Sequence, residues 1–183
     1  PETAHFYTHD LDRAKKLLAD AGYPNGIDIP TWGWPDQASM QRQELFTSQF
    51  AEAGIRLQVT PVPPAQAMQN FFLEKRGLAM LAPQGGLPDP SQIYERLFAG
   101  NALRNAGKIE LEGFRPLMDA TVTTSDPEER RQAFFKLQRY VIDQALHVPQ
   151  YTSAAMHIQS TRVKDFTFGL ITSPKFHRVW LEA

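Results

Sequence analysis

The chain has 183 residues, of which 42% are hydrophobic, enough for one well-buried core, so we expect a single compact domain over residues 1–183. Its 20 acidic and 19 basic residues nearly cancel without forming a basic stripe, which argues against a nucleic-acid partner. The lack of cysteine excludes disulfides and thiolate sites, and no run approaches the roughly 18 apolar residues that span a bilayer.

The first predicted helix runs from Asp10 to Ala21, where leucine and alanine recur at helical spacing. Asp10 is its expected N-cap, and Gly22 ends it. A turn at residues 23–26 leads into a short alternating strand, Ile27 to Trp32.

The next segments continue this alternation of helix and strand. A second helix is expected from Met40 to Ala53, followed by a strand from Ile55 to Val59. A third helix from Pro64 to Glu74 precedes an apolar strand, Leu78 to Ala82, predicted to be buried on both faces. The order indicates an α/β fold with a mixed, mostly parallel sheet flanked by helices.

Two Asp-Pro steps mark helix starts in the second half. Asp89 and Asp126 each precede a proline at the first helical position, and the second of these helices is expected to reach Ile142. Strands are predicted from His147 to Tyr151 and from Ala155 to Ser160, whereas the remaining residues are weakly patterned.

Four segments, in order, resemble the large solute-binding proteins of ABC importers for oligopeptides, dipeptides and nickel, known as family 5. The helix and turn from Ala14 to Gly26 are the most specific. The others are residues 50–57, the loop 88–91, and residues 125–130 together with Gln138 and Val148-Pro149.

The resemblance implies one lobe of a two-lobe protein, with the periplasmic binding protein type II fold. This chain is similar to the C-terminal lobe, and residues 173–183 resemble the segment that returns to the missing N-terminal lobe. The implied partners are a peptide-like or other small solute and the permease subunits of the membrane. We expect a periplasmic monomer, although the N-terminus carries no secretion signal.

The first loop that the resemblance brings to the ligand cleft follows the first strand. It contains Trp32, Gly33 and Trp34, and its two indoles beside a glycine form a flat surface for apolar side chains or sugar rings. The structural alternative is that both tryptophans belong to the core.

The second loop leads into the Asp89 helix. Glycine lets the backbone approach a ligand, and Gln84 supplies both a donor and an acceptor, so the predicted contacts are Gln84, Gly85, Gly86, Leu87 and Asp89. The alternative is a plain turn into a helix that Asp89 caps.

Two departures from the dipeptide binders of this family argue against a simple dipeptide as the ligand. The position that resembles their ammonium-binding aspartate is Gly86, and no basic residue occurs between Ile27 and Gln41 where they carry an arginine. The charged ends of a dipeptide would therefore be buried without partners from this lobe.

Other classes of function have weaker support. His5 and His9 could share a helical face and bind a metal, but they lie in a polar terminus, and His147, His157 and His177 are scattered. No nucleophile elbow or phosphate-binding loop occurs, so we expect neither an enzyme nor a cofactor. A sensor or chaperone-like module on the same fold, and a nickel-chelate binder, remain the alternatives.

Overall fold

The computed structural model describes residues 8–82, 85–145, 147–150, 156–169 and 173–182. By its internal contacts the chain divides into two compact units, Pro1–Pro83 with Arg96–Arg115, and Gln84–Glu95 with Pro116–Ala183. No helix among the described residues combines the length and the apolar character needed to cross a bilayer.

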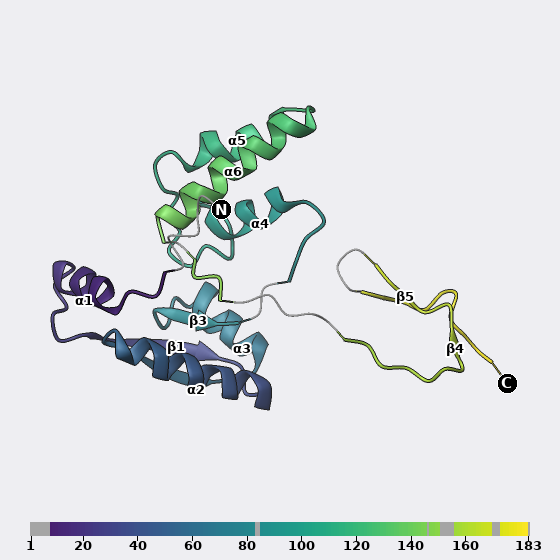
Figure 1. The fold of residues 1–183 in the computed structure, drawn as a ribbon, viewed down its shortest axis with the longest axis horizontal. Helices are drawn as coiled ribbons and strands as arrows, with labels where there is room; N and C mark the ends of the chain where they lie inside the picture. The colour runs from purple at the N-terminus through teal and green to yellow at the C-terminus, as the bar shows by residue number, and fades with distance from the viewer. Residues whose placement is uncertain (1–7, 83–84, 146, 151–155, 170–172, 183) are drawn as a thin grey trace. The chain divides into compact units, whose positions relative to one another are not determined.

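The first unit is built on a three-stranded parallel sheet with the order β2-β1-β3. Figure 1 labels β1 and β3 of this sheet. Its strands are β1 (Ile27–Gly33), β2 (Ile55–Pro61) and β3 (Ala79–Leu81). Helix α1 (Leu11–Asp20) precedes β1, and α2 (Gln37–Glu52) connects β1 to β2 and packs mainly against β2. The predicted parallel α/β arrangement is confirmed.

Local sequence explains where these helices begin. The Asp10 carboxylate accepts the Arg13 backbone N–H at 2.9 Å, and Asp36 accepts that of Ser39 at the same distance, so each aspartate satisfies an amide that the helix leaves unpaired. At the other end, Gly22 adopts φ +91° after α1 and Gly54 adopts φ +91° after α2, a conformation that glycine reaches without a steric penalty.

The third predicted helix forms in two parts. Helix α3 (Pro64–Met68) continues as a π-helical turn, η2 (Gln69–Leu73). Strand β3 is half-buried rather than buried on both faces, because it pairs with β1 alone and over only three residues.

Pro30 occupies the central strand, which normally excludes proline because every N–H there is needed. In a parallel sheet, the backbone N–H and C=O of one residue point to the same neighbouring strand, and those of the next residue point to the other. The Pro30 carbonyl accepts the Leu78 N–H at 2.8 Å, on the β3 side. Pro30 therefore faces the β3 side one residue before β3 begins, where the missing N–H costs no ladder bond.

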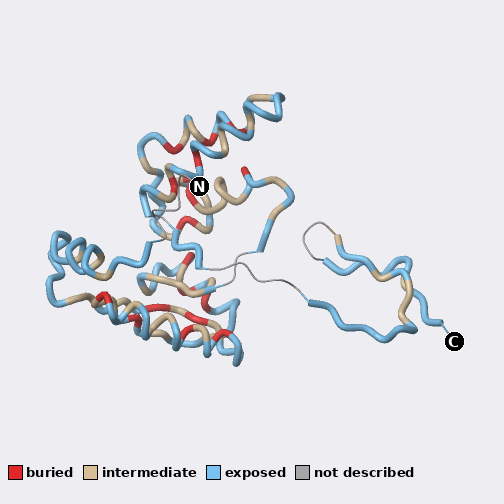
Figure 2. The backbone as a smooth tube through the Cα atoms, viewed as in Figure 1, coloured by how far each residue is buried: buried red, intermediate tan, exposed pale blue. Residues whose placement is uncertain are grey.

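The helices of the second half are α4 (Pro90–Phe98), α5 (Phe114–Thr123) and α6 (Pro127–Asp143). Asp126 caps α6 by accepting the Glu129 N–H at 2.8 Å, as predicted. In the second unit, α5 and α6 contribute the buried side chains Met118, Thr121, Leu137 and Val141. Figure 2 shows buried positions along these helices and along β1, whereas the C-terminal segment is largely exposed.

The C-terminal segment contains two short antiparallel pairs, β4 (Val163–Lys164) with β7 (Trp180–Leu181) and β5 (Thr167–Phe168) with β6 (Pro174–Lys175). The strands predicted at 147–151 and 155–160 are wrong over their described residues, which form no regular structure. Met156 and Ile158 are 92% and 95% exposed, so these residues have no surface to pack against, and apolar alternation alone did not make a strand.

Candidate functional site

The carboxyl ends of the three parallel strands form the first part of the candidate site. The register places Gly33 of β1 beside Pro61 of β2 and Leu81 of β3, so all three strands end at the same edge. In open α/β sheets ligands bind outside this edge, and the predicted aromatic loop begins there.

Trp32 is anchored by its own indole. Its Nε1 donates to the Arg76 carbonyl at 2.6 Å, which links β1 to the connection between η2 and β3. Gly77 follows with φ +80°, and a Cβ at that position would lie 2.7 Å from the same Nε1. The half-buried Trp32 is thus held in one orientation at the sheet edge.

Trp34 is fixed through its backbone and leaves its side-chain donor unused. Its carbonyl accepts a hydrogen bond of 2.9 Å from Nε2 of Gln43 in α2. The buried Gln43 side chain packs directly against Gly33, where a Cβ would lie only 2.6 Å from it. The Trp34 Nε1 is buried and has no hydrogen-bond partner among the described residues. A buried donor without a partner is energetically costly, and such groups recur at functional sites.

The second predicted loop belongs to the other unit. Gln84 lies outside the described residues. Gly85 and Gly86 are exposed, and a Cβ at either position would meet no atom within 4 Å, whereas Leu87 is half-buried. The role of this loop, like that of the aromatic loop, stays a prediction.

Asp89 is engaged within its own unit. Its Oδ1 accepts the Ser91 N–H and hydroxyl at 2.9 and 2.8 Å, and Arg130 Nη2 donates to both carboxylate oxygens at 2.9 and 2.7 Å. The Arg130 hydrogen bonds, with those of Ser91, lower the Asp89 pKa to about 2. The predicted cap is confirmed, and the arginine 41 residues away had no local sequence signal.

An open groove of about 450 Å³ lies along α5 and α6 in the second unit. None of the sequence-predicted site residues lines it. Its walls are Leu117, Ala120, Thr123, Thr124, Glu128, Glu129, Gln132, Ala133 and Lys136. The Glu128 pKa falls to about 2 because Arg131 and Gln132 bond to that carboxylate, so this charge of the groove is already paired.

No metal site is evident in the part of the chain that the structure describes, where no three histidine, aspartate or glutamate side chains gather in a position to hold an ion. Of the histidine pair considered above, His5 lies outside the described residues and His9 is exposed.

Sequence comparison finds relatives among bacterial binding proteins. The chain is 25% identical over 175 residues to heme-binding protein A of Haemophilus influenzae, which covers 92% of this chain and 31% of that protein. It is 24% identical over 184 residues to the dipeptide-binding protein of Escherichia coli, covering 96% and 34%. The chain thus spans about a third of the length of these relatives. No protein-family model matches it.

Solved structures show the same fold. The dipeptide-binding protein of Pseudoalteromonas sp. SM9913, in complex with Met-Leu, superposes with a TM-score of 0.76 at 21% identity, covering 94% of this chain and 36% of that one. The ABC transporter-associated periplasmic binding protein DppA from Helicobacter pylori superposes with a TM-score of 0.68 at 24% identity, covering 78% and 29%.

Proposed function

Because this chain is a homologue of the solute-binding proteins of ABC importers, we propose that it forms one lobe of such a protein and binds a small solute in a cleft that a second lobe completes. The observation that carries the proposal is the extent of the match. Almost the whole chain, 94%, superposes on a dipeptide-binding protein, but accounts for only 36% of it.

In this proposal Trp32, Gly33 and Trp34 at the sheet edge of the first unit contact the solute, and the loop from Gln84 to Leu87 in the other unit stays a separate prediction. Two features support a role for this edge: the indole of Trp32 is rigidly held, and the N–H of the Trp34 indole has no partner among the residues that the structure describes. Rigid aromatic side chains lose little entropy when a ligand stacks on them. Asp89 contributes by fixing the start of α4 rather than by contacting the solute.

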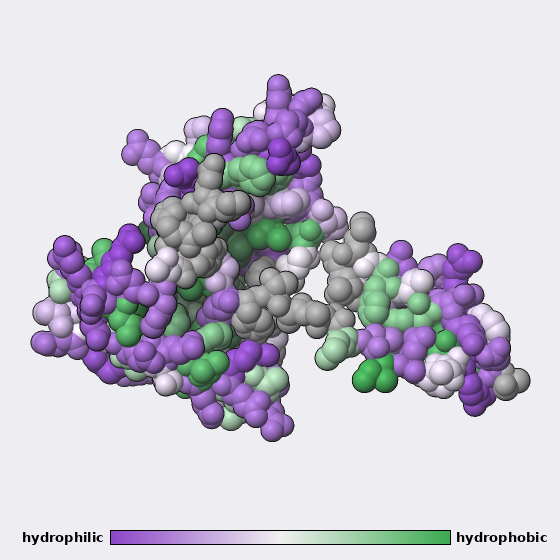
Figure 3. Space-filling view, in the orientation of Figure 1, coloured by the Kyte–Doolittle hydropathy of each residue, from purple (hydrophilic) through white to green (hydrophobic). Residues whose placement is uncertain are grey.

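The C-terminal segment supports a missing second lobe. Figure 3 shows green, apolar patches over this segment. Large apolar side chains are exposed there: Met156, Ile158, Phe176 and Leu181 are 92%, 95%, 66% and 66% exposed. The centre of the Phe166 ring lies 4.2 Å from that of the His157 ring and 5.7 Å from that of the Phe176 ring. We infer that this segment, including residues 173–183, packs against the remainder of a longer polypeptide.

The proposed mechanism is hinge closure. The solute meets one lobe, the second lobe swings over it, and permease subunits recognise the closed form in the periplasm. No chemical step is required, so the protein acts as a carrier and not as an enzyme. Closure selects solutes because a polar group left unpaired in the shut cleft costs far more than one in water.

The proposed solute is not a simple dipeptide. Gly86 offers no carboxylate for an ammonium group, and the aromatic loop carries no cation for a carboxylate. The nearest arginine along the chain, Arg42, donates to Ser39 Oγ at 2.8 Å within α2.

The test compares this chain with the longer polypeptide that contains it. Native mass spectrometry of the longer protein should show a co-purifying solute, and Trp34→Ala should reduce its occupancy, whereas Tyr23→Ala, an exposed aromatic in the turn after α1, should not. Calorimetry of the 183-residue chain should show no submicromolar binding. Submicromolar affinity in the short chain would contradict the two-lobe proposal.

A further inference from the structure

The turn between α1 and β1 contains an asparagine followed directly by a glycine, Asn25-Gly26. The Asn25 side chain is exposed and forms no hydrogen bond with a described residue. Its amide is therefore free to rotate toward the backbone nitrogen of Gly26. Attack of that nitrogen on the side-chain carbonyl carbon closes a succinimide ring, a reaction that needs no side chain other than that of the asparagine.

The fold requires glycine at the second position of this pair. Gly26 adopts φ +82°, and a Cβ there would lie 2.2 Å from the Gly54 carbonyl oxygen. A larger residue would hinder the attack, but it cannot occupy this position without displacing the turn after α2. Packing therefore requires the residue that hinders the reaction least.

Arg56 of β2 lies against the same peptide group. Its Nη1 donates to the Asn25 carbonyl at 3.2 Å, and a Cβ on Gly26 would lie 2.8 Å from that Nη1. Asp28 orients the guanidinium, because its carboxylate accepts from Nε at 2.6 Å and from Nη2 at 3.4 Å. A cation thus contacts the oxygen of the peptide bond whose nitrogen would attack.

This contact favours loss of the Gly26 amide proton. When the nitrogen gives up its proton, the negative charge is shared with the carbonyl oxygen of the same peptide, and a guanidinium at that oxygen stabilises it. One hydrogen bond opposes the reaction, since the Gly26 N–H donates to the Tyr23 carbonyl at 3.0 Å. That bond lies in a largely exposed turn, where local opening costs little free energy.

We propose that Asn25 is a site of spontaneous deamidation in the folded protein and that Arg56 promotes the reaction. The Gly26 nitrogen bonds to Asn25 Cγ, its proton passes through water to the departing amine, the bond from Cγ to Nδ2 breaks, and ammonia leaves. Water then opens the succinimide at either carbonyl and yields aspartate or isoaspartate, with no change of oxidation state. The site lies within the first unit and does not depend on the proposed transport function.

Both products change the start of β1. Aspartate introduces a negative charge into the turn, where the donors of Arg56 already serve Asp28. Isoaspartate inserts a methylene into the main chain just before Gly26, which has no spare room beside the Gly54 carbonyl. The modified protein should therefore be the less stable form.

The first test compares the folded protein with a synthetic peptide of residues 20–30 in the same buffer. Peptide mapping by mass spectrometry follows the conversion of Asn25 to aspartate and isoaspartate. In the folded protein Asn25 should convert at least as fast as in the peptide, and faster at higher pH, whereas the exposed Asn101, which precedes an alanine, should stay intact. Slower conversion of Asn25 in the folded protein than in the peptide would overturn the proposal.

The second test uses variants to measure the contribution of Arg56. Arg56→Gln should slow the conversion of Asn25 by about threefold or more, and Arg56→Lys, which keeps the positive charge, should recover part of the rate. Arg178→Gln, at an exposed arginine elsewhere in the chain, should leave the rate unchanged. Circular dichroism checks that each variant is folded.

Conversion in folded Arg56→Gln that is as fast as in the wild type would overturn the role of Arg56. The comparison of the wild-type protein with the peptide decides whether Asn25 is a deamidation site even if that variant fails to fold.

Discussion

Arg130 binds both carboxylate oxygens of Asp89, at 2.7 and 2.9 Å, across 41 residues of sequence. Its Nε donates to the Thr121 carbonyl at 2.8 Å, and its guanidinium lies 5.1 Å from the centre of the Phe134 ring. One arginine thus ties the start of α4 to α5 and α6 within the second unit.

We expect this pair to be energetically coupled. Asp89→Asn and Arg130→Gln should each lower the free energy of unfolding by about 1–2 kcal/mol, since the two side chains are about a third exposed and solvent screens part of the interaction. The double variant should lose less than the sum of the two. Urea denaturation of the four proteins measures the coupling, and strictly additive losses would contradict it.

The same pair should make stability depend on acid. The folded-state pKa of Asp89 is about 2, below its usual 3.8, so the folded protein binds this proton less readily than the unfolded chain. The stabilisation should be complete above about pH 4 and should disappear as the pH falls toward 2. The difference in unfolding free energy between wild type and Asp89→Asn, measured at pH 7, 4 and 3, should shrink with decreasing pH, whereas a constant difference would contradict the assignment.

The two tryptophans at the sheet edge should respond differently to the same substitution. Trp32→Phe removes the bond to the Arg76 carbonyl and should cost about 1 kcal/mol beyond the loss of ring area. Trp34→Phe removes a buried N–H that has no described partner and should be less costly or even stabilising. Thermal denaturation distinguishes them, and an equal or larger loss for Trp34→Phe would show that its N–H is satisfied.

Gly26 and Gly22 form a matched pair for steric effects. Both adopt positive φ, +82° and +91°, so alanine should strain the backbone equally at each position. A Cβ at Gly26 would lie 2.2 Å from the Gly54 carbonyl oxygen, whereas one at Gly22 would meet open space. Gly26→Ala should therefore cost at least about 2 kcal/mol more than Gly22→Ala in chemical denaturation, and equal losses would contradict the close approach of the two turns.

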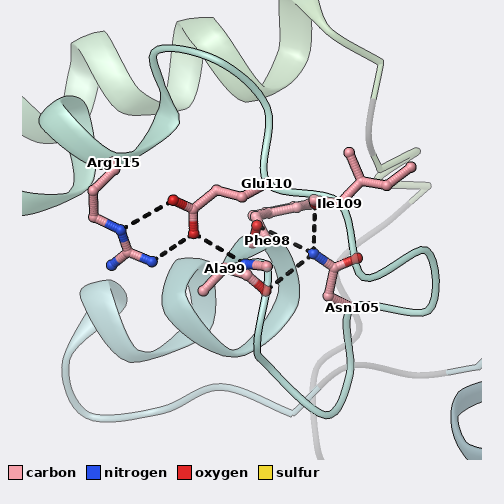
Figure 4. A network of polar contacts seen from close by, with 7 residues as sticks. Phe98, Ala99, Asn105, Ile109, Glu110 and Arg115 are labelled. Atoms are coloured by element: carbon pink, nitrogen blue, oxygen red, sulfur yellow. Dashed lines mark hydrogen bonds and ion pairs between the residues drawn. The ribbon is translucent and has the colours of Figure 1, made fainter.

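Asn105 should be the most sensitive polar position of the loop after α4. Asn105→Ala removes the side-chain donor that serves three carbonyls (Figure 4), of which that of Ala99 keeps the Ala102 N–H, and should lower the unfolding free energy by about 1–3 kcal/mol. Asn101→Ala, at an exposed position in the same loop, should be nearly neutral. Amide hydrogen exchange should also accelerate across the loop in the first variant only.

Much of the fold was predictable because its signals are local. The caps Asp10 and Asp126, the glycines after α1 and α2, and the alternation of helices with parallel strands all follow from neighbouring residues, and the predicted kinship with ABC solute-binding proteins is confirmed by the comparisons. Helix α5 was missed, although Gly113 precedes it and Phe114, Met118 and Thr121 repeat at helical spacing.

The candidate site was less predictable because its determining contacts join distant residues. Nothing near Trp32 indicates that its indole reaches the Arg76 carbonyl, and nothing near Asp89 identifies Arg130 as its partner. The apolar residues of 156–160 had the composition of a strand but lack a neighbour to pair with, which no local pattern reveals.

Strand β2 has a ladder on one side only, since β1 is its single described neighbour. The backbone N–H and C=O groups on the other side of this seven-residue strand are therefore a template with which another extended chain can pair. At the high protein concentrations used for crystallisation or storage, that margin is where edge-to-edge polymerisation would begin, and a lysine introduced there would be the simplest safeguard.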